Sequence, residues 1–78
     1  MKTRRYFDIT RQREDRRTIL DEWISQAVTY PAGELVQADS RIRRWALIEA
    51  AGHRYLRVVL LPDGETVHNA FFDRRFKP

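Results

Sequence analysis

The side chains best suited to chemistry are gathered in the last twelve residues, 67–78. This stretch holds one His, one Asn, one Asp, two Arg, one Lys and three Phe. Cations neutralise phosphate groups and flat rings stack on bases, so this mixture favours a nucleic-acid ligand. The alternative is structural, with Phe71 or Phe72 in the core and a solvated basic tail behind it. Both interpretations stay open at the level of sequence.

The composition favours the same kind of partner. The 78 residues carry a net charge of +4, and 13 of the 15 cations are Arg. A guanidinium grips phosphate with two parallel donors and stacks on bases, which suits a nucleic acid or an acidic protein. The chain has no cysteine, and His53 and His68 alone do not make a zinc site. We therefore expect no cofactor and no metal.

No stretch of the sequence approaches the roughly 18 apolar residues that a membrane span requires. We therefore expect a cytoplasmic protein without a membrane partner. The length predicts a single domain over residues 1–78.

The hydrophobic pattern predicts an α+β fold. A short strand is expected over residues 4–9, with Thr10 as the N-cap of a helical segment. Apolar residues spaced four apart between positions 19 and 28 form one apolar face of a helix, and Pro31 ends that helix. The charged run 11–17 lacks this stripe, so we expect one long helix or two short ones. The run itself either lines a phosphate groove or is a solvated helix face with internal ion pairs.

A sheet follows the helix. Strands are predicted over residues 41–49, 54–61 and 65–72, and a shorter one over 34–37. The Asp63-Gly64 turn joins the last two strands, with Gly in the left-handed position. These strands form a three- to four-stranded antiparallel meander with the helix packed on one face.

Turn chemistry assigns side chains to the two faces of this sheet. Pairing Leu61 with Glu65, and Glu49 with Arg54, places an apolar set under the helix and a more polar set on the opposite face. A slip of one residue would exchange the faces. The set expected under the helix is Trp45, Leu47, Leu56, Val58, Leu60, His68 and Ala70. The set expected on the open face is Arg44, Ala46, Ile48, Tyr55, Arg57, Val59, Val67, Asn69 and Phe71.

On that open face, Arg44, Tyr55, Arg57 and Asn69 would lie together close to the tail. Two guanidinium groups, a phenol and an amide among apolar side chains can hold a nucleotide. The alternative is that an open face must carry polar residues somewhere, and these are simply those residues.

Several motifs occur in a particular order: Glu22-Trp23-Ile24, Arg41-Ile42-Arg43-Arg44-Trp45, Tyr55-Leu56-Arg57-Val58-Val59, Asp63-Gly64, and residues 66–74. They resemble a group of short, uncharacterised bacterial proteins placed near the RelE/ParE/BrnT superfamily of small toxins. The resemblance spans roughly residues 19–77. The order of strand, helical segment and meander is also that of the superfamily.

The resemblance implies an RNA-directed protein, namely a metal-independent endoribonuclease of a toxin–antitoxin system. Its partners would be RNA or the ribosome and an antitoxin-like protein. Such toxins use the 2′-hydroxyl of the RNA as nucleophile, so the site needs cations and proton-transfer groups. The candidate catalytic residues are Arg57, Tyr55, His68, Asp73 and Arg74. The candidate nucleic-acid-binding residues are Arg44, Asn69 and Arg75.

Other functions stay open. ParE-type relatives act on gyrase and do not cut RNA, so the fold alone does not select an activity. The shortage of a convincing general base favours a non-catalytic module that binds nucleic acid or protein on the same scaffold. Spare strand edges would also suit pairing with another chain. His68 in the core and His53 in a loop each have a structural explanation, and the oligomeric state is not determined by the sequence.

Overall fold

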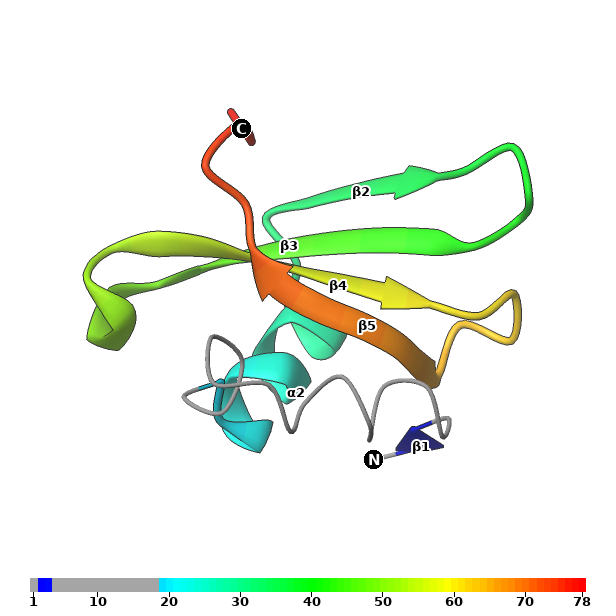
Figure 1. The fold of residues 1–78 in the computed structure, drawn as a ribbon, viewed down its shortest axis with the longest axis horizontal. Helices are drawn as coiled ribbons and strands as arrows, with labels where there is room; N and C mark the ends of the chain where they lie inside the picture. The colour runs from blue at the N-terminus through cyan, green and yellow to red at the C-terminus, as the bar shows by residue number, and fades with distance from the viewer. Residues whose placement is uncertain (1, 4–18) are drawn as a thin grey trace.

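The computed structural model describes residues 2–3 and 19–78, which form an α+β fold (Figure 1). The predicted strand over 4–9, the Thr10 cap and the charged run 11–17 lie outside these residues. The elements are β1 (Lys2–Thr3), α2 (Asp21–Thr29), β2 (Gly33–Val36), β3 (Ile42–Ile48), the 3-10 turn η2 (Glu49–Ala51), β4 (Arg54–Leu60) and β5 (Thr66–Phe72).

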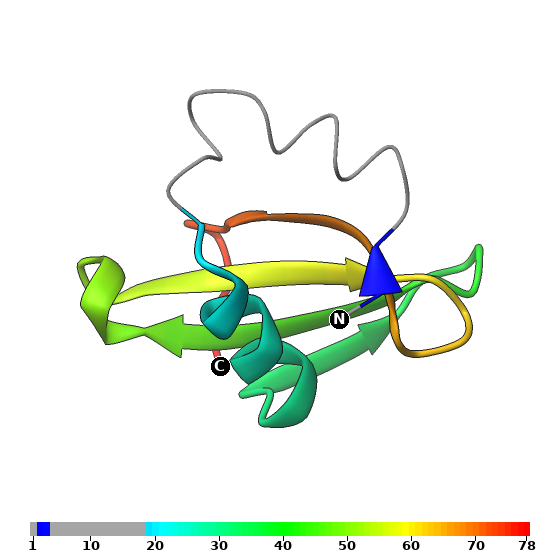
Figure 2. The same cartoon turned by 90° about the horizontal axis from the view of Figure 1, so that it is seen from below.

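Within the described residues, the strands form one five-stranded mixed sheet in the order β1-β5-β4-β3-β2. Strands β2 to β5 are the predicted antiparallel meander, and their bounds lie within one residue of the prediction. The fifth strand is β1, which pairs in parallel with the start of β5. Helix α2 covers one face of the sheet, and the segment after β5 leaves on the opposite side (Figures 1 and 2).

Helix α2 is held by its apolar face. Ile24 and Ala27 are fully buried against the sheet, as the spacing of four predicts, whereas Leu20 before the helix is 44% exposed. The helix ends at Thr29, and the amide of Tyr30 donates to the carbonyl of Gln26. Pro31 follows at once, so the predicted end of the helix is confirmed.

Two tight turns fix the strands of the meander. Between β2 and β3 the amide of Gln37 donates to the carbonyl of Arg41, and Ser40 takes a φ of 72°. This is a three-residue hairpin loop with a left-handed residue before the second strand. Between β4 and β5, Gly64 takes a φ of 74°, which is the left-handed position that the sequence predicts. The carboxylate of Asp63 accepts from the amides of Glu65 and Thr66 and closes that turn.

The predicted register was wrong at both hairpins. Turn η2 takes up Glu49, so Ile48 pairs with Arg54 and all side chains of β3 exchange faces. Arg44, Ala46 and Ile48 therefore lie on the helix side, and Trp45 lies on the open face. A slip of one residue suffices because side chains alternate along a strand.

Strand β5 differs for a second reason. Val59 pairs with Asn69 but Leu60 pairs with Val67, so a bulge leaves His68 outside the ladder. Val67 is fully buried in the core beneath the helix, although it was predicted on the open face. Beyond the bulge, Asn69 and Phe71 lie on the open face as predicted, opposite Val59 and Arg57. His68 is half-buried and is not part of the core cluster in which it was expected.

The core lies between α2 and the helix-facing side of β3, β4 and β5. Its fully buried large side chains are Ile24, Leu56, Leu60, Val58 and Val67.

Truncating the centre of this core should destabilise the fold strongly. Leu56→Ala removes a fully buried side chain, and we expect the free energy of unfolding to fall by about 2–5 kcal/mol. Leu35→Ala is the matched control, because Leu35 is 50% exposed at the sheet edge. Urea titrations followed by circular dichroism compare the two variants. Equal losses would contradict the position assigned to the core.

Candidate functional site

The open face of the sheet is organised around the carboxylate of Asp73, directly after β5. One of its oxygens, Oδ2, accepts from Nε1 of Trp45 at 3.0 Å and from Nε and Nη2 of Arg57 at 3.0 and 2.6 Å. The backbone amide of Asp73 donates to the carbonyl of Tyr55 at 2.9 Å, which continues the ladder beyond β5. Strands β3 and β4 position Trp45 and Arg57 side by side, because these two residues are direct partners in the register.

This carboxylate is held in its ionised form. Burial leaves the Asp73 side chain only 7% exposed and by itself raises the pKa. The hydrogen bonds from Trp45, Arg57 and the Arg75 amide, with the positive charge of Arg57, outweigh burial and lower the pKa to about 2. At neutral pH Asp73 is therefore a fixed anion and a poor proton donor or acceptor.

The residues after Asp73 fold back over the open face. The Phe76 ring stacks on Trp45, with ring centroids 4.6 Å apart, and meets the edge of Tyr55 at 4.9 Å. Gly33 makes room for this ring, since a Cβ at that position would lie 2.7 Å from Cζ of Phe76. The tail is therefore docked at two points, by a carboxylate and by an aromatic ring.

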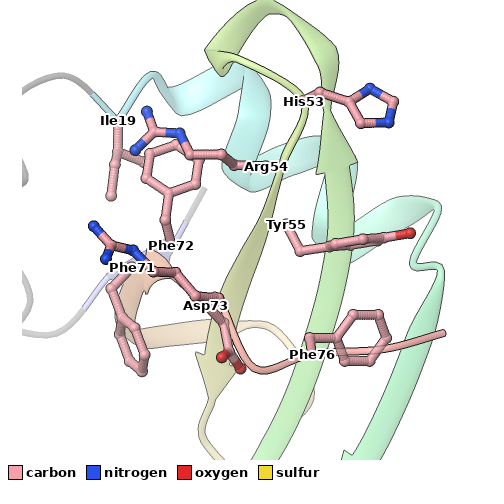
Figure 3. A pocket seen from close by; sticks show the side chains of 9 residues that line it. Ile19, His53, Arg54, Tyr55, Phe71, Phe72, Asp73 and Phe76 are labelled. Carbon is pink, nitrogen blue, oxygen red and sulfur yellow. The ribbon is translucent and has the colours of Figure 1, made fainter.

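A pocket of about 530 Å³ lies beside this docked tail, at the end of the sheet where β4 begins and β5 ends. This volume falls in the roughly 300–1,000 Å³ range of ordinary ligand sites. Figure 3 shows Arg54 and Phe72 on one side of the pocket and Tyr55 and Phe76 on the other. The lining residues are Ile19, His53, Arg54, Tyr55, Phe71, Phe72, Asp73, Arg74 and Phe76.

The pocket carries cations whose charge is not neutralised within it. The Cζ atom of Arg54 lies over the Phe72 ring, 3.9 Å from the ring centroid, and its Nε donates to the carbonyl of Ala51 at 2.6 Å. Among the described residues, neither Arg54 nor Arg74 forms an ion pair. Of the described residues that line the pocket, Asp73 alone carries a carboxylate, and Arg57 already pairs with it. The pocket is therefore electropositive and walled by aromatic rings.

The structure brings together some of the predicted site residues. Tyr55, Asp73 and Arg74 line the pocket, and Arg57 lies next to it through its ion pair with Asp73. Asn69 shares the open face with them, one position before the fully buried Ala70. Arg75 follows Arg74 at the surface, where its amide donates to Oδ1 of Asp73.

Two predicted residues lie elsewhere. His68 is in the bulge of β5 and does not line the pocket. Arg44 lies on the helix side, where its Nη1 donates to the carbonyl of Val28 at 2.9 Å and its Nε pairs with Glu34 at 2.8 Å. The register slip of β3 is the reason for its displacement.

Three residues at this site were not among the predicted site residues: His53, Arg54 and Phe76. His53 takes a positive φ of 59° directly before β4. This loop residue, for which a structural explanation was expected, lines the pocket. Arg54 was treated as a strand end, and its stacking on Phe72 depends on the register. Phe76 belonged to the segment flagged for its aromatic and basic residues, which was the one available signal.

No family model matches the chain, and neither a curated protein nor a solved structure matches it. The resemblance to RelE-like toxins therefore stays a prediction. Within residues 2–3 and 19–78, no helix is long and apolar enough to cross a membrane. The same residues contain no group of three or more His, Asp or Glu side chains placed to hold a metal ion.

The Asp73 cluster should make stability depend on acid pH. A folded-state pKa of about 2, against an unfolded value near 4, corresponds to roughly 2 kcal/mol of stability. This contribution is complete above about pH 4–5 and is lost as the pH falls through 2. We expect Asp73→Asn to lower the unfolding free energy at pH 7 and to reduce its decline between pH 5 and pH 2.

Denaturant titrations across that pH range test this expectation. Part of the decline should remain in the variant, because turn hydrogen bonds also lower the pKa of Asp63 to about 2. Glu49→Gln is the control, since this exposed carboxylate lies in η2, away from the cluster. An Asp73→Asn profile parallel to that of the wild type would contradict the assigned role.

Proposed function

We propose that this chain binds single-stranded RNA in the pocket between Arg54 and Tyr55. The observation that carries the proposal is the pairing of two uncompensated guanidinium groups with aromatic rings around one hollow of suitable size. Single-stranded nucleic acids are bound by this combination, in which cations take phosphates and rings stack on bases. RNA is preferred over DNA because the resemblance to RelE-like toxins predicts an RNA target.

Arg54 supports phosphate binding through its fixed position. Stacking on Phe72 and the bond from Nε to Ala51 hold the guanidinium plane, while its two terminal nitrogens stay available for a bidentate contact. A cation that is already ordered loses less conformational entropy when it binds phosphate. Arg74 supplies a second positive charge from the turn that follows β5.

Tyr55 supports base binding. It is half-buried beside Phe76, and their rings meet edge to face at 4.9 Å. A ring fixed by such a neighbour offers a stacking surface, and base–aromatic stacking contributes about 1–3 kcal/mol per base. Phe71 and Phe72 extend the aromatic lining toward the opposite wall.

The Arg57–Asp73 pair favours binding over catalysis. Both side chains were candidate catalytic residues. They form an ion pair with each other, with Nη2 of Arg57 2.6 Å from Oδ2 of Asp73, and the low pKa of Asp73 keeps its carboxylate ionised. They serve better as a fixed support for the pocket than as a proton relay. The non-catalytic module is therefore the function that the geometry supports best.

RNA cleavage is a second candidate, and one observation favours it. His53 and Tyr55 line the same pocket as Arg54 and Arg74, so two proton-transfer groups and two cations are within one site. Imidazole titrates near neutral pH and is the commonest general acid or base. In this form the protein is a metal-independent endoribonuclease of toxin type, and an antitoxin-like partner is then expected.

Fluorescence anisotropy with a labelled single-stranded RNA tests the binding function. We expect Arg54→Ala/Arg74→Ala to weaken binding at least tenfold and to lower the slope of log K against log salt by about 1.4, since each lost phosphate contact removes about 0.7. The control Lys2→Ala/Arg41→Ala removes the same charge at the opposite end of the sheet. Tyr55→Ala should weaken binding without changing the salt slope.

If both double variants lost the same amount of RNA affinity, binding in the pocket would be contradicted, and only a general effect of net charge would explain the result. A single-stranded DNA of the same sequence is run in parallel, and tighter binding to DNA would overturn the choice of RNA. The same samples, with and without ribosomes, are resolved on a gel. Cleavage products that form with the wild-type chain and are absent with His53→Ala would establish that the protein cleaves RNA and does not only bind it.

A further inference from the structure

We infer that β2 pairs edge to edge with β2 of a second copy of this chain, forming a two-fold symmetric dimer. This inference is independent of the RNA pocket, which lies at the end of the sheet beside β4 and β5. It rests on the exposed side chains, the backbone direction and the charge of the four residues Gly33–Val36.

The first observation is the exposure of apolar groups at this edge. In the described part of the chain, β2 has β3 as its one neighbour in the sheet. Of the four large hydrophobic residues that are exposed in the described part of the chain, two lie in β2, namely Leu35 at 50% and Val36 at 63%. An uncovered strand edge with apolar side chains is a template for another strand.

The second observation is the direction of the backbone groups. The bond from the Gln37 amide to the Arg41 carbonyl makes these two residues a hydrogen-bonded pair of the β2–β3 ladder. Residues alternate along an antiparallel strand, so Leu35 directs its backbone groups toward β3. Those of Glu34 and Val36 are directed outward, toward an added strand.

The third observation is the absence of a charge barrier within β2. Edge strands are commonly protected by Lys, Pro or an unpaired charge. Strand β2 reads Gly-Glu-Leu-Val, and its one charged side chain, Glu34, is paired with Arg44 of β3 at 2.8 Å. A second copy can therefore approach the edge without meeting a net charge.

Symmetry then selects the register. When two copies join in one continuous sheet, residues directly opposite each other lie on the same face, so a residue of odd number faces one of odd number. An axis at Leu35 places Leu35 opposite Leu35 of the second copy, and Glu34 opposite Val36. Glu34 and Val36 both direct their backbone groups outward, so they can form a hydrogen-bonded pair across the two copies. An axis at Glu34 would place two carboxylates opposite each other, which is unfavourable. An axis at Val36 would place Leu35 opposite Gln37, beyond the end of β2, whereas an axis at Leu35 pairs three residues of β2 with β2 of the second copy. Leu35 therefore lies on the axis.

This register makes β2 self-complementary, which is the reason for choosing a second copy over an unrelated chain. It resembles the isologous interfaces of two-fold dimers, in which one patch contacts itself. It also predicts a distance. Opposed residues that are not hydrogen-bonded to each other have Cα atoms about 4.5 Å apart, which lies within the range that a disulfide can span.

Cysteine cross-linking tests the register in a chain that has no cysteine of its own. We expect Leu35→Cys to form a covalent dimer in air, seen on a non-reducing gel and reversed by reductant. Leu20→Cys is the matched control, since Leu20 is also exposed but lies before α2. Glu34→Cys should cross-link poorly, because it faces Val36. Equal cross-linking at all three positions would overturn the register.

Sedimentation velocity of the wild-type chain tests the dimer itself. We expect a dimer whose fraction rises with protein concentration, and a shift to monomer in Leu35→Lys, where two ammonium groups would meet on the axis. Leu20→Lys should sediment as the wild type does. A wild-type chain that is monomeric over the whole range would overturn the inference, whatever the variants show.

Discussion

The open side of this protein depends on one buried carboxylate. Asp73 binds Trp45 of β3, Arg57 of β4 and, through its own amide, the carbonyl of Tyr55. These contacts continue the sheet beyond its last strand and set the direction of the chain that follows. The stacking of Phe76 on Trp45 is a consequence of that direction. Without the carboxylate, the tail would keep the bond from the Asp73 amide to Tyr55 and the stacking of Phe76, but it would lose its three side-chain bonds to Trp45 and Arg57.

The same contact decides which charges are available for a ligand. Although the chain is rich in arginine, several guanidinium groups are engaged in the structure: Arg57 by Asp73, Arg44 by Glu34 and the end of α2, and Arg43 by Gln37. Arg54 and Arg74 are different, because both line the pocket without an acidic partner among the described residues. The local balance of charge, and not the net charge of the chain, therefore favours an anionic ligand at this position.

The sequence was sufficient for the elements and insufficient for their faces. Alternation, the Asp63-Gly64 turn and Pro31 placed the strands and the helix end within a residue or so. The predicted faces of β3 were wrong because the sequence does not fix the length of a turn to within one residue. Turn η2 takes up one residue more than expected, which shifts the register of all of β3. In β5 the longer turn and the bulge at His68 compensated each other, so Asn69 and Phe71 fell on the expected side. Asp73 and Arg57 were selected as candidates, but Trp45 as their partner required the correct register, as did the stacking of Arg54 on Phe72.

Helix α2 shows how far local structure here relies on the sheet. Its first turn has no side-chain cap, and its last turn has no basic residue, so the partial negative charge at its end is not balanced from within the helix. Arg44 of β3 supplies that cation by donating to the carbonyl of Val28. Nine residues without their own caps are too few to stay helical alone in water. Helix and sheet must therefore form and melt together, which makes unfolding of this part of the chain a single cooperative event.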